Sequence, residues 1–212
     1  MSLKYNSAAA KGFCRACHGV LKIGMCILPW KTPQVLSGEG SSAQLPALIR
    51  ESGIQKVLIV TGRNVRGHGL LDNMLAVMDE AGPEYVIYDG SRPNPTDKNV
   101  ADGVSIFKET GCQAIIAFGG GSPMDCAKGI AAMAVKPGKS IRQLQGLFKV
   151  HKKTPPIFAV PTTAGTGSET TIAAVITEEA THHKASINDL CLMPKAAVLD
   201  LSLIHISEPT RH

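Results

Sequence analysis

Aromatic side chains are scarce in this chain, where they make up only 4% of 212 residues. Its 22 lysine and arginine residues give a formal net charge of +5, but they are spread along the sequence. A nucleic-acid groove needs clustered cations and rings on which bases stack. We therefore expect no nucleic-acid partner, because a modest positive field suits a small anionic cofactor better.

Long apolar runs are also absent. No uninterrupted apolar segment reaches the roughly 18 residues that a membrane-spanning helix requires, so we expect no membrane partner. Lys and Arg interrupt the apolar residues of the N-terminus, unlike the core of a secretory signal. These features favour a cytoplasmic protein whose six cysteines are reduced thiols. With 44% apolar and 18% charged residues, the chain is typical of a globular protein.

One N-terminal motif offers an alternative function. CRACH, from Cys14 to His18, matches the C-x-x-C-H pattern of covalent haem attachment. That route demands export, for which the sequence shows no signal. Apolar residues also recur here at helical spacing before Pro29, which favours an amphipathic helix. We predict an N-terminal helical extension over residues 1–32, with a haem or electron-transfer protein as the alternative.

From residue 56 onward, short apolar runs alternate with longer amphipathic ones. The runs typical of strands are 56–61, 84–90, 113–121 and 156–161. Helical patterns cover 67–81, 96–110 and 123–135. This alternation predicts an α/β fold over residues 33–200, a Rossmann-like parallel sheet with helices on both faces. Two further runs, 172–177 and 195–200, suggest an added hairpin or closing strands.

A glycine-rich turn follows the third predicted strand, where ligands of such folds bind. The segment is GGGSPMDCAK, residues 119–128. Its glycines let the backbone approach a ligand, and Pro123 suits the first position of a helix. Ser122 and Asp125 have the spacing of a capping box. A glycine-fronted helix N-terminus binds phosphate, although a plain strand-to-helix turn would use the same residues.

A second candidate segment follows the fourth predicted strand. VPTTAGTGSET, residues 160–170, carries five hydroxyl groups and two glycines with hardly any charge. Such a loop can donate hydrogen bonds to phosphate or ribose oxygens, although most hydroxyl-rich loops are solvated turns. Its place at the end of a strand beside the glycine turn supports a binding role.

Together, these two segments and SRPNPT (91–96) closely resemble the iron-containing alcohol dehydrogenase family. The likeness runs in order from about Pro33 to Asp200. It implies a dinucleotide-binding α/β domain, followed in the family by an all-helical domain that holds a divalent metal and is absent here. It also implies a homo-oligomeric parent enzyme that transfers hydride between an alcohol or aldehyde and NAD(P).

The resemblance also implies residue roles. The residues that would face the cofactor pyrophosphate are Gly120, Gly121, Ser122 and Asp125. Those that would contact the rest of the nucleotide are Asn94, Thr162, Thr163, Thr166 and Thr171. Lys184 in HHKASIND would approach the ribose, although a lone lysine is more often a solvated surface residue.

The end of the first predicted strand bears on the choice of cofactor. An acid near this point binds the ribose 2′-hydroxyl and repels a 2′-phosphate. The resembled family often has Asp there, whereas this chain has Gly62 followed by Arg63. Arg63 could pair with a phosphate through two hydrogen bonds. We therefore predict that NADP is accepted and preferred, the alternative being that Gly62 serves a turn and Arg63 points to water.

The family's metal ligands are not recognisable in this chain. The family uses one Asp and three His, the first two in a helical D-x-x-x-H, and no such motif occurs here. Adjacent His182 and His183 would chelate poorly, so we expect a solvated loop pair. Three further cysteines are expected as small core residues: Cys112, Cys126 and Cys191.

We therefore expect iron or zinc only in the full-length parent, and an inactive truncated chain. The alternatives are a related glycerol dehydrogenase or dehydroquinate synthase-like enzyme, whose glycine and threonine loops differ, and a stand-alone nucleotide-binding module.

The last residues of the chain carry no recognisable helix or cap. Leu201–Arg211, LSLIHISEPTR, is identical to the first-frame translation of a transposase sequencing adapter. We therefore expect residues 201–212 to be a non-native tail, which is excluded from fold prediction.

Overall fold

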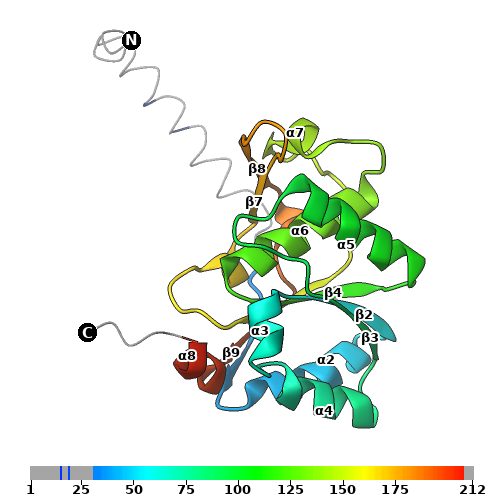
Figure 1. The fold of residues 1–212 in the computed structure, drawn as a ribbon, viewed down its shortest axis with the longest axis vertical. Coiled ribbons are helices and arrows are strands. Elements are labelled where there is room, and N and C mark those ends of the chain that lie inside the picture. The colour runs from blue at the N-terminus through cyan, green and yellow to red at the C-terminus, as the bar shows by residue number, and fades with distance from the viewer. Residues whose placement is uncertain (1–14, 16–18, 20–30, 208–212) are drawn as a thin grey trace. The chain divides into compact units, whose positions relative to one another are not determined.

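The computed structural model describes Arg15, Gly19 and residues 31–207 (Figure 1). The chain divides into two compact units, residues 1–31 and 32–212. The predicted CRACH motif at Cys14, Cys17 and His18 lies outside the described residues, as does most of the predicted N-terminal helix. Among the described residues, no helix is long and apolar enough to cross a membrane.

A six-stranded sheet forms the centre of the second unit, and all its pairings are parallel. The strand order is β1-β9-β6-β4-β2-β3. The strands are β1 (Gln34–Gly38), β2 (Lys56–Val60), β3 (Glu84–Tyr88), β4 (Ala114–Gly119), β6 (Ile157–Pro161) and β9 (Ala196–Asp200). The predicted parallel α/β fold is therefore confirmed.

Helices cover both faces of this sheet (Figure 1). On one face lie α2 (Leu45–Glu51) and α4 (Asp72–Ala81), and on the other lie α5 (Asp97–Glu109) and α6 (Gly121–Val135). Alternate residues of one strand enter the two cores, because successive strand side chains point to opposite faces. Ile115 packs into the α5–α6 core, for example, and Ile116 into the α2–α4 core.

A three-stranded sheet lies beside this core, with strand order β5-β8-β7. Its strands are β5 (Gly146–Leu147), β7 (Ala173–Thr177) and β8 (Lys184–Asn188), and α7 (Ile141–Leu144) precedes it. β7 contacts α6 and pairs antiparallel with β8. The predicted run 172–177 therefore belongs to a hairpin, whereas the run 195–200 is β9 in the main sheet.

One predicted helix differs from the structure, and one strand of the main sheet was not predicted. The predicted helix 67–81 begins only at Asp72, as α4, and a separate short helix, α3 (Arg63–Gly67), precedes it, because Gly69 has a positive φ of 68° between the two. The strand β1 was not predicted, since its sequence QVLSG is short and largely exposed at the edge of the sheet.

The start of α6 also differs from the prediction. The helix begins at Gly121 with Gly120 as its N-cap, and no side chain caps it. Pro123 therefore occupies the third helical position rather than the first. The predicted Ser122–Asp125 capping box is wrong, because the Ser122 hydroxyl accepts from the backbone N–H of Asn94 and Asp125 accepts from the backbone of Val175.

Residues predicted to carry no helix form α8 (Leu201–Ser207). The Asp200 carboxylate accepts hydrogen bonds from the backbone N–H and hydroxyl of Ser202, which satisfies a donor of the first turn. Leu203 is 3% exposed and packs into the α2–α4 core. Local capping and this buried contact account for a helix that the sequence pattern did not indicate.

Candidate functional site

A cleft of about 680 Å³ opens at the carboxyl ends of three neighbouring strands. Its walls come from residues 62–65 after β2, 88–93 after β3 and 120–123 at the start of α6, with Asn99 and Asp102 from α5. The chain leaves β2 for the edge strand β3 and returns to β4 on the other side of β2. Such a reversal of strand order is where open α/β sheets bind their ligands.

The N-terminus of α6 faces this cleft without a side-chain cap. The first N–H groups of a helix lack partners within the helix, and its dipole places partial positive charge there. Gly120 and Gly121 add no side chain in front of these groups. The arrangement can therefore receive an anion such as phosphate.

The hydroxyl loop, defined as residues 162–171, runs beside this helix start. A methyl group placed on Gly120 would lie 3.2 Å from Thr163 Oγ1. One placed on Gly121 would lie 3.4 Å from Ser168 Oγ and 3.9 Å from Thr166 Cβ. The two glycines thus allow the hydroxyl loop to approach α6 closely enough for both to contact one ligand.

Hydrogen bonds also connect two more predicted residues, Asn94 and Lys184, to the start of α6. The backbone N–H of Asn94 donates to Ser122 Oγ at 3.4 Å, and Lys184 Nζ donates to Asn94 Oδ1 at 3.1 Å. Asn94 has a positive φ of 55°, a conformation that Asn tolerates better than most residues. Lys184 and Asn94 are both exposed, so their remaining polar groups are accessible from solvent.

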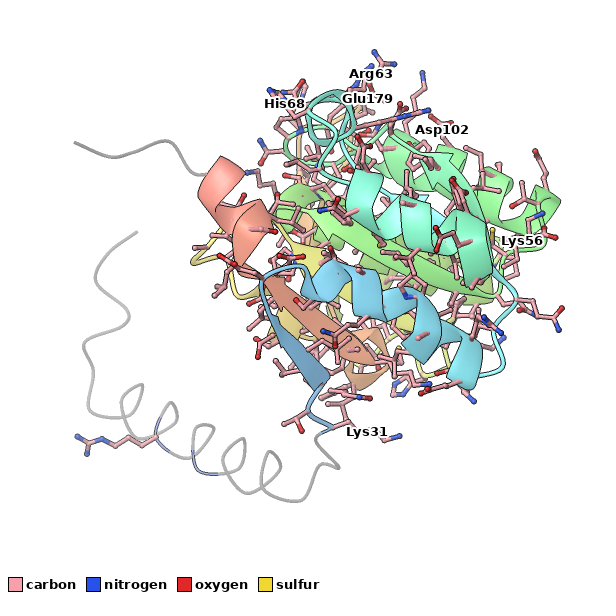
Figure 2. The ribbon with its side chains drawn as sticks, turned by 90° about the horizontal axis from the view of Figure 1, so that it is seen from below. Lys31, Lys56, Arg63, His68, Asp102 and Glu179 are labelled. Atoms are coloured by element: carbon pink, nitrogen blue, oxygen red, sulfur yellow. The ribbon has the colours of Figure 1, made fainter. Side chains whose placement is uncertain are left out.

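The part of the cleft after β2 holds Gly62 and Arg63. Figure 2 shows the Arg63 side chain extending outward from the same side of the molecule as Asp102. The neighbouring strand β3 is followed by Asp89, which also lines the cleft and forms an ion pair with Arg66 at 2.8 Å. The chain therefore has no acidic residue directly after β2, but it has Asp89 directly after β3, where Arg66 partly neutralises the carboxylate.

Tyr88 and Asn99 close the inner wall of the cleft. The Tyr88 hydroxyl donates to the backbone oxygen of Asn99 at 2.8 Å. Burial, followed by the charges of Cys126 and Asp102, raises the pKa of Tyr88 well above its usual range. The phenol therefore stays neutral and serves as a polar but uncharged wall.

Two charged residues of α6, Asp125 and Lys128, are not part of the cleft lining and bond to β7 or to the hydroxyl loop before it. Burial raises the pKa of Asp125 to about 6, while the hydrogen bond from Val175 and the charge of Lys128 act in the opposite direction. Burial lowers the pKa of Lys128 to about 8, opposed by the charges of Asp125 and Glu169. Lys128 bonds to Ser168, Thr171 and Ala173.

The predicted site residues fall into three groups in space. Those that line the cleft are Gly62, Gly120, Gly121 and Ser122. Those that lie against this lining through the contacts above are Asn94, Thr163, Thr166 and Lys184. Those held by contacts within the protein are Asp125, Thr162 and Thr171.

The sequence prediction missed two charged residues of this region. Asp89 stands directly after the apolar strand EYVIY, a position that could have drawn attention to it. Lys128 is a lone cation among the small and apolar residues of α6, and that isolation was the available signal. Neither signal identifies a bonding partner, because those partners lie far away in sequence.

The part of the chain that the structure describes contains no group of three His, Cys, Asp or Glu side chains able to hold a metal ion. His182 and His183 are exposed in the turn between β7 and β8, as predicted. Cys112 and Cys126 are buried and Cys191 is partly buried, all as free thiols. These residues therefore do not fit a metal centre.

Comparison with known proteins agrees with this architecture. The family model "Iron-containing alcohol dehydrogenase" matches residues 32–201. Alcohol dehydrogenase 4 of Schizosaccharomyces pombe is 42% identical over 165 residues, which cover 78% of this chain and 39% of that protein.

Two solved structures are similar over most of this chain. A 1,3-propanediol oxidoreductase superimposes with a TM-score of 0.81 and 36% identity, covering 86% of this chain and 48% of its own. Sulfoacetaldehyde reductase from Bifidobacterium kashiwanohense, solved in complex with NAD+, gives a TM-score of 0.74 and 28% identity over 86% of this chain and 48% of its own. The present chain thus spans 39% to 48% of the length of these proteins. Because the match covers most of the chain and includes both the sheet and the glycine turn, the chain belongs to the iron-containing alcohol dehydrogenase family.

Proposed function

We propose that the chain binds the dinucleotide NAD(P) in the cleft described above. The observation that carries this proposal is the N-terminus of α6, which faces the cleft without a side-chain cap and is fronted by glycines. A pyrophosphate supplies the negative charge and the acceptor oxygens that such a helix start lacks. The NAD+ complex of a similar structure supports the same class of ligand.

The contacts above suggest a role for each group of residues. Gly120, Gly121 and Ser122 would receive the pyrophosphate, with Thr163 and Thr166 donating from the opposite side. Asn94 and Lys184 would contact the sugar. Thr162 and Thr171 would act by holding the hydroxyl loop in place, because their bonds lie within the protein. Asp125 would act less directly, by joining α6 to Val175 of β7.

We further propose a preference for NADP over NAD. Gly62 places no carboxylate after β2, and Arg63 is exposed in the cleft, where it can pair with a 2′-phosphate. Asp89 acts against this preference, but its ion pair with Arg66 offsets part of the negative charge.

For the whole protein, we propose hydride transfer between the nicotinamide and a small alcohol or aldehyde. The names of the family, alcohol dehydrogenase, and of a similar structure, 1,3-propanediol oxidoreductase, support this class of reaction. The described residues do not fit a metal centre. We therefore propose that a metal is held by residues outside those described, and that the 212-residue chain binds nucleotide without turning over alcohol.

Calorimetric titration of the 212-residue chain with NAD+ and NADP+ tests the binding proposal. We expect saturable binding of both, with NADP+ the tighter ligand. Failure of both nucleotides to bind at about millimolar concentration would overturn the proposal. An alcohol oxidation assay on the same preparation, with added Fe²⁺ or Zn²⁺, should show no nicotinamide reduction. Turnover there would contradict the proposed inactivity and leave the binding result intact.

A further inference from the structure

Lys128 is a buried cation that the cleft itself does not use. It lies in the middle of α6 with 1% of its surface exposed, between Ala127 and Gly129, which are also buried. Burying an ammonium is costly unless its donors are satisfied. None of the ion pairs among the described residues includes Lys128. Hydrogen bonds to neutral oxygens, together with the nearby charges of Asp125 and Glu169, must therefore offset the cost.

Those oxygens all come from one short segment. Lys128 Nζ lies 2.8 Å from Ser168 O, 2.6 Å from Thr171 O, 3.0 Å from Thr171 Oγ1 and 3.1 Å from Ala173 O. An ammonium has three N–H donors, so four acceptors at these distances use all of them. The segment 168–173 comprises the end of the hydroxyl loop and the first residue of β7. Lys128 therefore fastens the C-terminal end of that loop to α6.

The other end of the hydroxyl loop is fastened to the sheet. The backbone N–H of Thr162 donates at 3.1 Å to the oxygen of Gly119, the last residue of β4. Between these two anchors lie residues 163–167, of which Ala164, Gly165 and Thr166 are exposed. Loops with exposed backbone and few buried contacts open at low free-energy cost. The two anchors therefore help to hold this part of the loop in position.

The anchored loop is the one that faces the N-terminus of α6. The close approaches of Thr163 to Gly120 and of Ser168 to Gly121 exist only while the loop lies against the helix. A nucleotide that contacts both sides needs them at a fixed separation, because ordering a mobile loop on binding reduces affinity. Lys128 is placed to supply that order before the nucleotide arrives.

We propose that Lys128 is a positioning residue for nucleotide binding, whose ammonium holds residues 168–173 on α6 and thereby keeps the hydroxyl loop beside the helix N-terminus. This inference rests on the proposed function of the cleft. A compact ammonium suits four converging oxygens, whereas the planar guanidinium of arginine does not. Because burial lowers the pKa of Lys128 only to about 8, the ammonium is the main form at pH 7, where the test is made.

The test compares three variants of the 212-residue chain at pH 7. Lys128→Met keeps the length and apolar bulk of the side chain but removes every donor. Lys128→Gln keeps two N–H donors without charge. Lys108→Met, at an exposed position of α5, makes the same chemical change away from the cleft and serves as the control. Each variant is measured by hydrogen exchange without nucleotide and by calorimetric titration with NAD+ and NADP+.

For Lys128→Met we expect amide protection in the hydroxyl loop to fall about tenfold or more, while β4 and β6 keep theirs. Nucleotide affinity should fall about tenfold, with Lys128→Gln intermediate and Lys108→Met unchanged. Wild-type loop protection in Lys128→Met, or affinity within about twofold of the control, would overturn the proposal.

Two other outcomes are also decisive. If Lys128→Met does not fold, Lys128→Gln carries the same comparison, and failure of both to fold would show a general core role and overturn the proposal. If the wild-type chain binds neither nucleotide, the proposed function of the cleft fails. Loop protection in the nucleotide-free variants then decides by itself whether Lys128 positions the loop.

Discussion

Arg66 Nη1 lies 2.8 Å from Asp89 Oδ2, so that a cation of α3 pairs with the acid that directly follows β3. Both side chains are partly exposed, and a pair of this kind contributes little to stability. The ion pair matters more for the charge of the cleft, because both Asp89 and Arg63 line it. If the cleft binds NAD(P) as proposed, cofactor choice would depend on the balance between Arg63 and the partly neutralised carboxylate of Asp89.

Replacing Arg63 with alanine should weaken NADP+ binding about tenfold and change NAD+ binding less than about twofold. The reason is that only NADP+ carries a 2′-phosphate for the guanidinium to bind. Titration of the variant with both nucleotides at one fixed salt concentration measures the effect. Arg142→Ala, on α7 outside the cleft lining, is the control for loss of one positive charge. An equal decrease in affinity for the two nucleotides would show that Arg63 does not bind the 2′-phosphate.

Asp89→Asn should increase the preference for NADP+ over NAD+, the opposite of the effect expected for Arg63→Ala. The change removes a negative charge from the cleft and releases Arg66 from its ion pair. We expect NADP+ to bind about threefold to tenfold more tightly, since charge repulsion falls. NAD+ affinity should stay the same or decrease. The ratio of the two dissociation constants is the measurement, and a ratio equal to that of the wild type would exclude Asp89 from cofactor selection.

A single methyl group at Gly120 should interfere with the anion site. The added carbon would lie 3.2 Å from Thr163 Oγ1, in the space between α6 and the hydroxyl loop. Gly120 has φ −76° and ψ −164°, a conformation that alanine can adopt, so the fold should persist. We expect affinity for both nucleotides to fall about tenfold.

Gly67→Ala is the matched control for this methyl group. Gly67 lies in α3, and no atom would come within 4 Å of a methyl group added there. Calorimetric titration and a thermal unfolding scan on both variants separate lost binding from lost stability. Gly120→Ala with the affinity of Gly67→Ala would mean that the nucleotide does not use the gap between the helix and the loop.

Much of the fold could be predicted from hydrophobic periodicity and from the glycine and proline residues at the ends of elements. Strands such as β4 (AIIAFG) are short apolar runs that end in glycine, and their burial on both faces gives them a continuous pattern. The start of α6 could be placed within a few residues because glycines and Pro123 mark it. These signals are local, and each predicted element depends only on its own residues.

The features that the sequence did not reveal depend on contacts between distant segments. β1 pairs with β9 from the other end of the domain, and its own sequence QVLSG carries little strand signal. Lys128 finds its acceptors 40 to 45 positions away in sequence. The Ser122–Asp125 spacing suggested a local cap, but both side chains instead bond to distant backbone. Local patterns cannot decide between such competing partners.

Asp125 should make stability depend on pH, with a sign that its raised pKa determines. Its pKa rises from 3.8 to about 6, so the folded state binds more protons than the unfolded state between these values. Stability from this group therefore falls as pH rises from about 4 to 6. Asp125→Asn keeps an acceptor for Val175 and removes the buried charge.

We expect Asp125→Asn to be about 1 kcal/mol more stable than the wild type at pH 7.5, a value discounted for partial exposure and for the lost attraction to Lys128. The difference should disappear toward pH 4. Urea unfolding at several pH values measures it, with exposed Glu109→Gln as the control. A difference that stays constant from pH 4 to 7.5 would show that Asp125 does not titrate differently in the folded state.

Asp200 should be among the most sensitive positions for stability, because one fully buried carboxylate joins three segments. It accepts the backbone N–H groups of Gly40 and Ser42 at 3.0 Å each and that of Ser202 at 3.1 Å. Burial raises its pKa, but bonds from Ser202, Ser42 and Gly40 outweigh this and hold the pKa of Asp200 below its ordinary value. Removing the carboxylate leaves these buried donors without an acceptor.

We expect Asp200→Ala to lose about 3 kcal/mol of unfolding free energy at pH 7, and Ser202→Ala only about 1 kcal/mol, since it leaves the carboxylate bonded to Gly40 and Ser42. Because the folded pKa is depressed, the stabilisation is present above the unfolded value and is lost as pH falls through the folded one. The difference in unfolding free energy between wild type and Asp200→Ala should therefore decrease below about pH 4. Urea unfolding of the wild type and the two variants at pH 7 and pH 3.5 measures these differences in unfolding free energy. Equal losses for the two variants would place the stabilisation in the contact with α8, and not in the joining of β9 to the segment after β1.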